Sequence, residues 1–312
     1  MSAKQAARVF LERSPYVSWA KQLPAFRHPA FTGVVHPDLP IWAGEPNPPP
    51  EPAPGSHASL PRIARLAKTE TEALPEFHVQ TISGARCGSI KDVKERIAAA
   101  SDAGASAILM VTGDSGPTKV LPRKGTTGRF DSVRLLKEAA AMRARGEVHE
   151  DVHLACVANP SLEGSAHGPG RLRAKLEAGA EMVVTQPALI QSNHRAWWDA
   201  VKAEGLHLEL EVIFGVTHFN NVRSLRFWHG LCGVEDDAEG AEEARVWEEY
   251  ERTMDAETFA FWRDERLDLA TSAALADVDG DGVHLMPVTE EGYAGVARLA
   301  DTIQALASAR SS

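Results

Sequence analysis

Polar residues stand where several apolar stretches of this sequence end. Thr112, Gly113 and Asp114 follow AILMV, Gln186 follows EMVVT, and Thr217 follows VIFGV. Such stretches are typical of buried parallel strands, whose carboxyl ends meet at one edge of a sheet or one mouth of a barrel. Hydroxyl, amide and carboxylate groups that converge there predict a site for a small polar molecule.

The residues at these tips leave alternatives open. The Asp114 carboxylate either caps the turn after Gly113 or faces the mouth as a charged group. Gln186 is either a satisfied loop amide or a ligand-binding one, and Lys175 lies on a helix face that is either solvated or part of a site. The sequence has no HxH pair, no carboxylate cluster with metal spacing and no G-x-S-x-G. We therefore expect neither a metal site nor a serine nucleophile.

Composition excludes other classes of protein. The 312 residues include 33 Lys and Arg against 43 Asp and Glu, a net charge of −10 that argues against a nucleic-acid binder. No apolar run approaches the length of a membrane span, and the first residues lack the apolar core of a secretion signal. The three cysteines have no metal-ligand spacing, so we expect reduced thiols in a cytoplasmic protein.

The elements that position the tips alternate between strand and helix. Ser89 and Asp92 predict the start of a helix, and Gly104 predicts its end. An apolar strand follows that helix, and the same order of helix, Ala-Gly-Ala turn and apolar strand occurs again before Gln186. Six strands are visible, over 77–83, 107–112, 152–158, 182–186, 208–216 and 282–288, with helices around 131–145, 194–204, 221–231 and 241–265. This order predicts a parallel α/β fold.

A (β/α)₈ TIM-type barrel needs two more strands, which residues 1–60 must supply, and TGVVH at 32–36 is one candidate. The segment 37–54 holds eight prolines and predicts an extended strap that covers the barrel. We expect one domain, with 1–60 as an irregular Pro-rich part of the barrel and 61–312 as its main body. A doubly wound sheet is the alternative, but no G-x-G-x-x-G follows an early strand.

Six segments in order resemble the methylenetetrahydrofolate reductase family over about residues 76–300. They are FHVQTI, AILMVTGD, HLACVANP, RLRAKLEAGAEMVVTQ, VIFGVTHFNNVRSLRFWHGLCGV and GVHLMPV. The resemblance implies a (β/α)₈ barrel that holds FAD and uses NADH or NADPH to interconvert 5,10-methylenetetrahydrofolate and 5-methyltetrahydrofolate. A divergent member of the family can work in the oxidative direction, for methyl-group catabolism.

The resemblance also implies roles for single residues. Asp114 and Gln186 take the catalytic positions: Asp114 stabilises a cationic iminium form of the substrate, and Gln186 contacts folate and nicotinamide. The positions that line the flavin are His78, Thr112, Gly113 and Lys175. Thr217 and Phe219 join Gln186 in binding the substrate.

The sequence departs from the family pattern at three places. The family's first strand carries FE-x-FPP, whose Glu protonates the substrate; we find no such motif in residues 1–60, and Glu45 is the nearest approach. Thr112 replaces an arginine, and Gly168 replaces an aspartate. The alternatives are therefore a non-catalytic pterin- or flavin-binding barrel and a flavin-free NADH-dependent reductase. The sequence leaves the direction, the nicotinamide and the oligomeric state open, a homo-oligomer included.

Overall fold

Eight parallel strands pair in chain order and close into a barrel, with β1 lying between β2 and β8. The computed structural model describes residues 8–14, 17–38, 63, 74–113, 130–276, 281–287 and 289–311. The strands are β1 (Arg8–Glu12), β2 (Gly33–His36), β3 (Phe77–Ser83), β4 (Ala107–Val111), β5 (His153–Ala158), β6 (Met182–Pro187), β7 (Glu211–Thr217) and β8 (Gly282–Met286). The predicted TIM-type barrel is confirmed.

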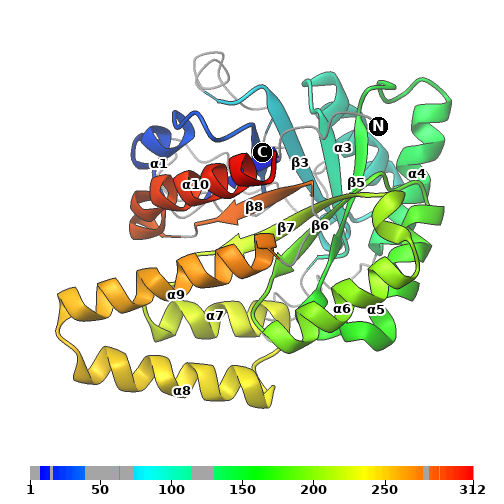
Figure 1. Cartoon of the computed structure of the whole chain (residues 1–312). Coiled ribbons are helices and arrows are strands. Elements are labelled where there is room, and N and C mark those ends of the chain that lie inside the picture. Colours follow the sequence, from blue (N-terminus) through cyan, green and yellow to red (C-terminus); the bar gives the residue numbers. More distant parts are fainter. Residues whose placement is uncertain are drawn as a thin grey trace.

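Helices surround the barrel and lie between successive strands (Figure 1). They are α1 (Trp19–Phe26), α3 (Ile90–Asp102), α4 (Ser132–Ala144), α5 (Pro160–Glu177), α6 (Gln191–Ala203), α7 (Val222–Cys232), α8 (Ala238–Thr253), α9 (Ala256–Ala276) and α10 (Glu290–Ser311), with short turns η2 (Gly84–Arg86) and η3 (Leu206–Leu208). None of the helices in the described ranges combines the length and apolar character that a membrane span requires.

The amino-terminal part of the chain supplies the two strands that were missing from the sequence pattern. The candidate at 32–36 is found as β2, and β1 is a strand of only five residues that the pattern did not indicate. β1 pairs with both neighbours, Phe10 opposite Gly33 of β2 and opposite His284 of β8. The Pro-rich residues 39–54 and the helix expected near 59–74 lie outside the described residues, apart from Ile63 and Leu74, and the division into 1–60 and 61–312 stays a prediction.

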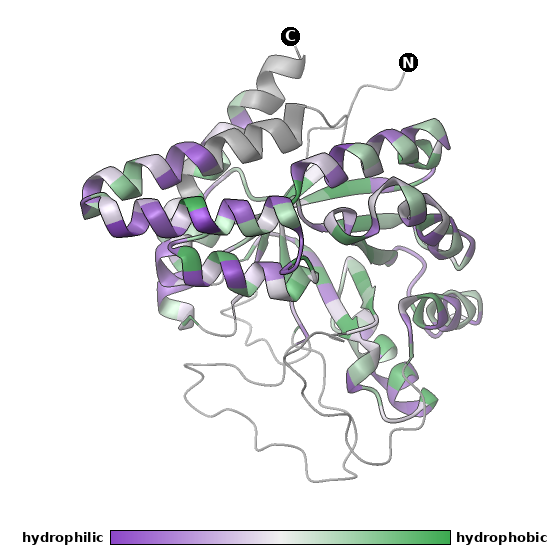
Figure 2. Cartoon of the chain, turned by 90° about the horizontal axis from the view of Figure 1, so that it is seen from below, coloured by the Kyte–Doolittle hydropathy of each residue, from purple (hydrophilic) through white to green (hydrophobic). Residues whose placement is uncertain are grey.

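Side chains of the strands alternate between the barrel interior and the surrounding helices. The interior cluster contains Phe10, Val79, Leu109, Val184 and Ile213. The neighbouring residues along each strand belong to the layer beneath the helices. Figure 2 shows apolar residues along the strands and mixed apolar and polar faces on the helices. This alternation decides which strand residues can reach the mouth.

The local signals around the repeated unit are confirmed. Ser89 Oγ accepts a hydrogen bond from Asp92 N at 3.1 Å and so starts α3. Gly104 and Gly179, which follow α3 and α5, have φ angles of +85° and +103°. Glycine adopts this left-handed conformation without steric cost, which lets the chain leave each helix and enter the next strand.

The single helix predicted over 241–265 is wrong, because the chain forms α8 and α9 there. Met254 is extended, and Asp255 Oδ1 accepts hydrogen bonds from Glu257 N and Thr258 N at 3.1 and 2.9 Å. These bonds start a new helix. With α7, the two helices form an extension beside the barrel (Figure 1). Aromatic residues such as Trp228, Trp247 and Phe259 fill its own small core.

Candidate functional site

Gln186 lies at the end of β6, after the inward-facing Met182 and Val184 and within a register shift between Val184 and Pro187. Its Oε1 accepts a hydrogen bond from the Cys232 thiol, with 3.9 Å between oxygen and sulfur. Burial raises the pKa of Cys232 to about 12, so the thiol keeps its proton and donates. The contact orients the amide with its nitrogen on the side opposite Cys232.

Thr217 reaches the inner face at the end of β7, two residues after Gly215. Its hydroxyl donates to the backbone oxygen of Met286 at 3.0 Å and thereby ties β7 to β8. Phe219 lies beyond the strand, where its ring meets the Trp247 ring edge-on at 5.8 Å between centroids. Thr217 and Gln186 therefore share the mouth, whereas Phe219 lies between the mouth and the helical extension.

Thr112 and Gly113 form the exit of β4. Thr112 Oγ1 accepts from Ser132 N at 3.1 Å, and its backbone oxygen accepts from Ala85 N at 2.9 Å. Gly113 has a φ of +92°, and a Cβ there would lie 2.3 Å from Ser83 Oγ. The exit thus requires glycine on both conformational and steric grounds. Asp114, the next residue, lies outside the described residues, so its catalytic role stays a prediction.

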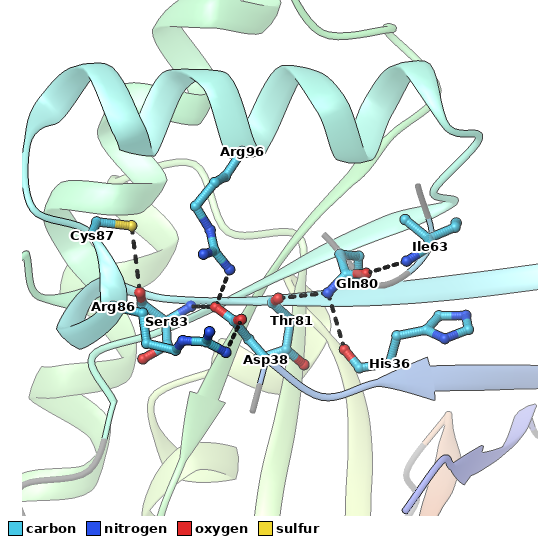
Figure 3. Close-up of polar contacts among 9 residues, drawn as sticks. All are labelled: His36, Asp38, Ile63, Gln80, Thr81, Ser83, Arg86, Cys87 and Arg96. Atoms are coloured by element: carbon cyan, nitrogen blue, oxygen red, sulfur yellow. Dashed lines mark hydrogen bonds and ion pairs between the residues drawn. The ribbon is translucent and has the colours of Figure 1, made fainter. Parts of the chain in front are cut away.

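An ionic cluster fixes the neighbouring rim at the ends of β2 and β3 (Figure 3). The Asp38 carboxylate accepts from Ser83 N at 2.9 Å and from Arg86 Nη1 at 2.8 Å, and it also pairs with Arg96 of α3. Asp38 and Arg96 are buried, so this pair is shielded from water. The cluster gives the β3 side of the mouth a fixed backbone.

His78 faces away from the barrel interior because it alternates with Val79 in β3. Its Nδ1 lies 3.0 Å from Nε2 of His36, and the two rings are stacked. Burial lowers the pKa of His78, and the Arg13 guanidinium acts in the same direction. Gln80, on the same outer face, binds Ile63 N and the backbone oxygen of His36 (Figure 3). The structure does not bring His78 together with the residues of the mouth.

Lys175 is engaged within the protein. Its Nζ donates to the backbone oxygen of Val157 at 2.5 Å. Burial raises the pKa of Glu163 in the same region, and the charges of Lys175 and Arg171 oppose that shift. Arg171 Nη1 lies 3.6 Å from the Glu163 carboxylate. Lys175 therefore helps to compensate a buried carboxylate of α5.

The described residues do not fit the flavin cradle that the resemblance implies. Of its four predicted residues, Thr112 and Gly113 lie at the mouth, Lys175 binds Val157, and His78 faces outward. A Cβ at Gly168, where the family has an aspartate, would lie 2.0 Å from the Trp197 ring. A carboxylate is therefore excluded there unless Trp197 moves.

Glu12 is a candidate site residue that sequence reasoning missed. It ends β1 on the same inner face as Phe10, and its Oε2 lies 3.3 Å from Nε2 of His284 in β8. Its side chain is 21% exposed, so it is accessible from the mouth. The only signal was the spacing Glu12-Arg13-Ser14-Pro15, which keeps the distance from Glu to Pro in FE-x-FPP without its phenylalanines. Glu45, named in its place, lies outside the described residues.

Solved structures of other barrel proteins are similar to this chain at low identity. One is a putative phosphonomutase from Burkholderia cenocepacia J2315, 16% identical, with 70% of this chain and 81% of that chain covered and a TM-score of 0.43. Two are structures of oxaloacetate acetylhydrolase, the second with its product oxalate. Both are 12% identical, cover 68% and 72% of this chain and 66% and 73% of theirs, and have TM-scores of 0.41 and 0.42. No curated protein matches the chain.

A family model identifies the chain more directly. The model for methylenetetrahydrofolate reductase matches residues 59–239, which is more than half of the 312 residues. The matched range includes β3 to α7 and therefore the exits of β4, β6 and β7 described above. The chain belongs to the methylenetetrahydrofolate reductase family, whose members are folate-related one-carbon oxidoreductases.

Proposed function

We propose that this protein interconverts 5,10-methylenetetrahydrofolate and 5-methyltetrahydrofolate by hydride exchange with NADH or NADPH. The observation that carries the proposal is the position of Glu12: a carboxylate at the mouth, beside His284, on the same inner face as Thr217 and at the same end of the barrel as Gln186. A carboxyl group there suits general acid–base chemistry on a small molecule.

In the reductive direction, Glu12 is the proton donor. Protonation of N10 accompanies cleavage of its bond to the one-carbon unit, which opens the five-membered ring and leaves a cationic iminium at N5. Hydride then adds to the exocyclic carbon and gives the methyl group. In the oxidative direction the same steps run in reverse, and the Glu12 carboxylate takes the proton back. Proton transfer of this kind contributes about 10²–10⁴-fold to a rate.

The other predicted residues have positioning and electrostatic roles in this proposal. Gln186 presents its amide nitrogen to the pterin or nicotinamide, while Thr217 and Phe219 line the β7 side of the mouth. Asp114, directly after the tight exit at Gly113, stabilises the iminium cation as a fixed anion. We also propose that the protein works in the cytoplasm, because its three cysteines are free, buried thiols.

The test is turnover measured in both directions: 5-methyltetrahydrofolate with an electron acceptor, and 5,10-methylenetetrahydrofolate with NADH or NADPH. Turnover by the wild type and its loss in Glu12→Gln support the proposal. Folate binding without turnover in either direction would overturn it in favour of a non-catalytic carrier. Absorbance of the purified protein near 450 nm separates a flavin-containing enzyme from one that passes hydride directly.

A further inference from the structure

The end of β1 is bound by side chains from two helices far apart in the chain. The Tyr293 hydroxyl of α10 donates to the backbone oxygen of Glu12 at 2.5 Å and accepts from Ser14 N at 2.7 Å. Gln22 of α1 binds both backbone groups of Ser14: its Oε1 accepts from Ser14 N at 3.0 Å, and its Nε2 donates to the Ser14 backbone oxygen at 2.9 Å. Together they hold the backbone on both sides of Arg13.

These contacts are shielded from water. Tyr293 is 4% exposed and Gln22 is 2% exposed. Burial raises the pKa of Tyr293 well above its ordinary value, so the hydroxyl keeps the proton that it donates to Glu12. The two helices are joined to each other as well, through packing of Phe26 against Tyr293 and an ion pair at 2.5 Å between Lys21 and Glu290.

The held residues set the direction of the Glu12 side chain. Arg13 points to the outer layer, where it is 1% exposed and its guanidinium lies 4.4 Å from the centre of the Trp19 ring. Because side chains alternate along a strand, an outward Arg13 requires an inward Glu12. The last bond to β2, from Arg13 N to Val35 O at 2.9 Å, holds one side of this backbone. The Tyr293 bonds to Glu12 O and Ser14 N hold the other side and so preserve the alternation at the end of β1.

We propose that Tyr293 and Gln22 are positioning residues that act through Glu12. This inference rests on the proposed function and adds two residues from outside the mouth to it. A proton donor must lie within hydrogen-bond reach of N10, and a displacement of about 1 Å can cost about 10²-fold in rate. The hydroxyl of Tyr293 fixes the peptide that carries the carboxylate, so its removal lets that carboxylate move without changing the charge or shape of the mouth.

The experiment is a double-mutant cycle on the full chain with 5-methyltetrahydrofolate and an electron acceptor. Tyr293→Phe removes the hydroxyl and keeps the ring that packs on Phe26. We expect kcat to fall about tenfold with the folate KM within about twofold. In the Glu12→Gln background, Tyr293→Phe should cause no further loss, because the group that it positions is gone. Tyr250→Phe removes an equal hydroxyl from α8, where the ring packs on Trp262, and should retain wild-type kcat.

Each other outcome overturns a defined part of the argument. If Tyr293→Phe is as active as the wild type while Glu12→Gln is inactive, the positioning role is wrong and the proposed function stands. If Tyr293→Phe lowers kcat equally in both backgrounds, Tyr293 does not act through Glu12. If Glu12→Gln retains full turnover, the acid–base role of Glu12 is wrong and the positioning role fails with it, while the interconversion itself stands. Should Tyr293→Phe unfold at the assay temperature, Gln22→Met repeats the cycle, since it removes the amide contacts to Ser14 at similar volume.

Discussion

Two glutamates lie near the carboxyl ends of strands, Glu12 as the last residue of β1 and Glu163 after β5, and their surroundings differ in exposure and in charge. Glu12, at the end of β1, has a side chain that is 21% exposed and faces one histidine, His284. Glu163, in the first turn of α5, has a side chain that is 7% exposed and lies near two cations, Arg171 and Lys175. Burial raises the pKa of Glu163, which marks the cost of holding its charge inside the protein.

In the proposed function, this difference separates a carboxylate that takes part in proton transfer from one that contributes to the stability of the fold. A proton donor to a ligand needs access to the mouth and a geometry fixed from outside, which Glu12 has through Tyr293 and Gln22. A buried carboxylate needs compensating charge, which Glu163 receives from Lys175 and Arg171. The family resemblance assigns Lys175 to a flavin, whereas in this structure Lys175 belongs to the charges that compensate the buried Glu163.

The largest effect is expected at Glu12. Glu12→Gln keeps the shape of the side chain and removes its titratable proton, so kcat should fall about 10²–10⁴-fold while the melting temperature changes little. The measurement is steady-state turnover of 5-methyltetrahydrofolate beside a thermal melt. Glu163→Gln is the matched control and should keep kcat within about twofold. Equal losses in the two variants would remove the distinction between the glutamates.

Lys175→Met should destabilise the protein by about 2 kcal/mol at pH 8, because a buried carboxylate loses a compensating charge. The pKa of Glu163 is already raised in the folded state, and it rises further without Lys175. The pKa of Glu163 is about 4.5 in the unfolded chain and higher in the folded protein. The protonated side chain therefore stabilises the fold at a pH below 4.5, and this stability is lost as the pH rises through the pKa of the folded state. The deficit of Lys175→Met relative to the wild type should therefore be larger at pH 8 than at pH 5.

Urea unfolding at the two pH values measures this deficit. Adding Glu163→Gln to Lys175→Met should restore part of the stability at pH 8, because the uncompensated charge is removed. A deficit of the same size at pH 5 and pH 8 would show that Lys175 contributes only its hydrogen bond to Val157.

His284 should have a smaller effect than Glu12, because it touches the carboxylate without carrying the proton to the ligand. His284→Leu should lower kcat about tenfold, because it removes the polar ring nitrogen that lies 3.3 Å from the Glu12 carboxylate. His284→Gln retains a polar side chain that can donate to Glu12 and should recover part of that loss. Identical kcat values for the Leu and Gln variants would contradict this role.

The smallest effect is expected at Cys232, which touches Gln186 and neither glutamate. Cys232→Ala removes the donor to Gln186 Oε1, so the amide is held less firmly and the folate KM should rise about threefold. Since the pKa of the thiol is about 12, the change in KM should be the same at pH 6 and pH 9. A change in kcat with an unaltered KM would assign Cys232 a different role.

Sequence reasoning predicted the parts of the molecule that local interactions determine. The Ser89 cap, the turns at Gly104 and Gly179 and the tips after β4, β6 and β7 each depend on a few consecutive residues, and all are present. Gln186 and Thr217 were placed at the mouth because they follow strands long and apolar enough to be recognised.

The rest depends on residues that are distant in the sequence. β1 has five residues with a charge at each end, and it is a strand because β2 and β8 flank it. Without that strand, no pattern placed Glu12 at a tip. The partners of Lys175 and His78 also come from other elements, namely Val157 and His36. The break between α8 and α9 does have a local signal, namely Asp255, whose side chain caps the start of α9. The helical periodicity on both sides of Asp255 obscured that signal.

The bond between Tyr293 and Glu12 joins residues 281 positions apart. During synthesis, β1 leaves the ribosome first but has no β8 to pair with and no α10 to fix its end. Contacts of such long sequence separation form late, because the entropy of closing a long loop must be overcome before they stabilise the fold. The carboxylate that we propose for proton transfer therefore reaches its final position only when nearly the whole polypeptide has been made, so we expect a nascent or interrupted chain to be inactive towards folate.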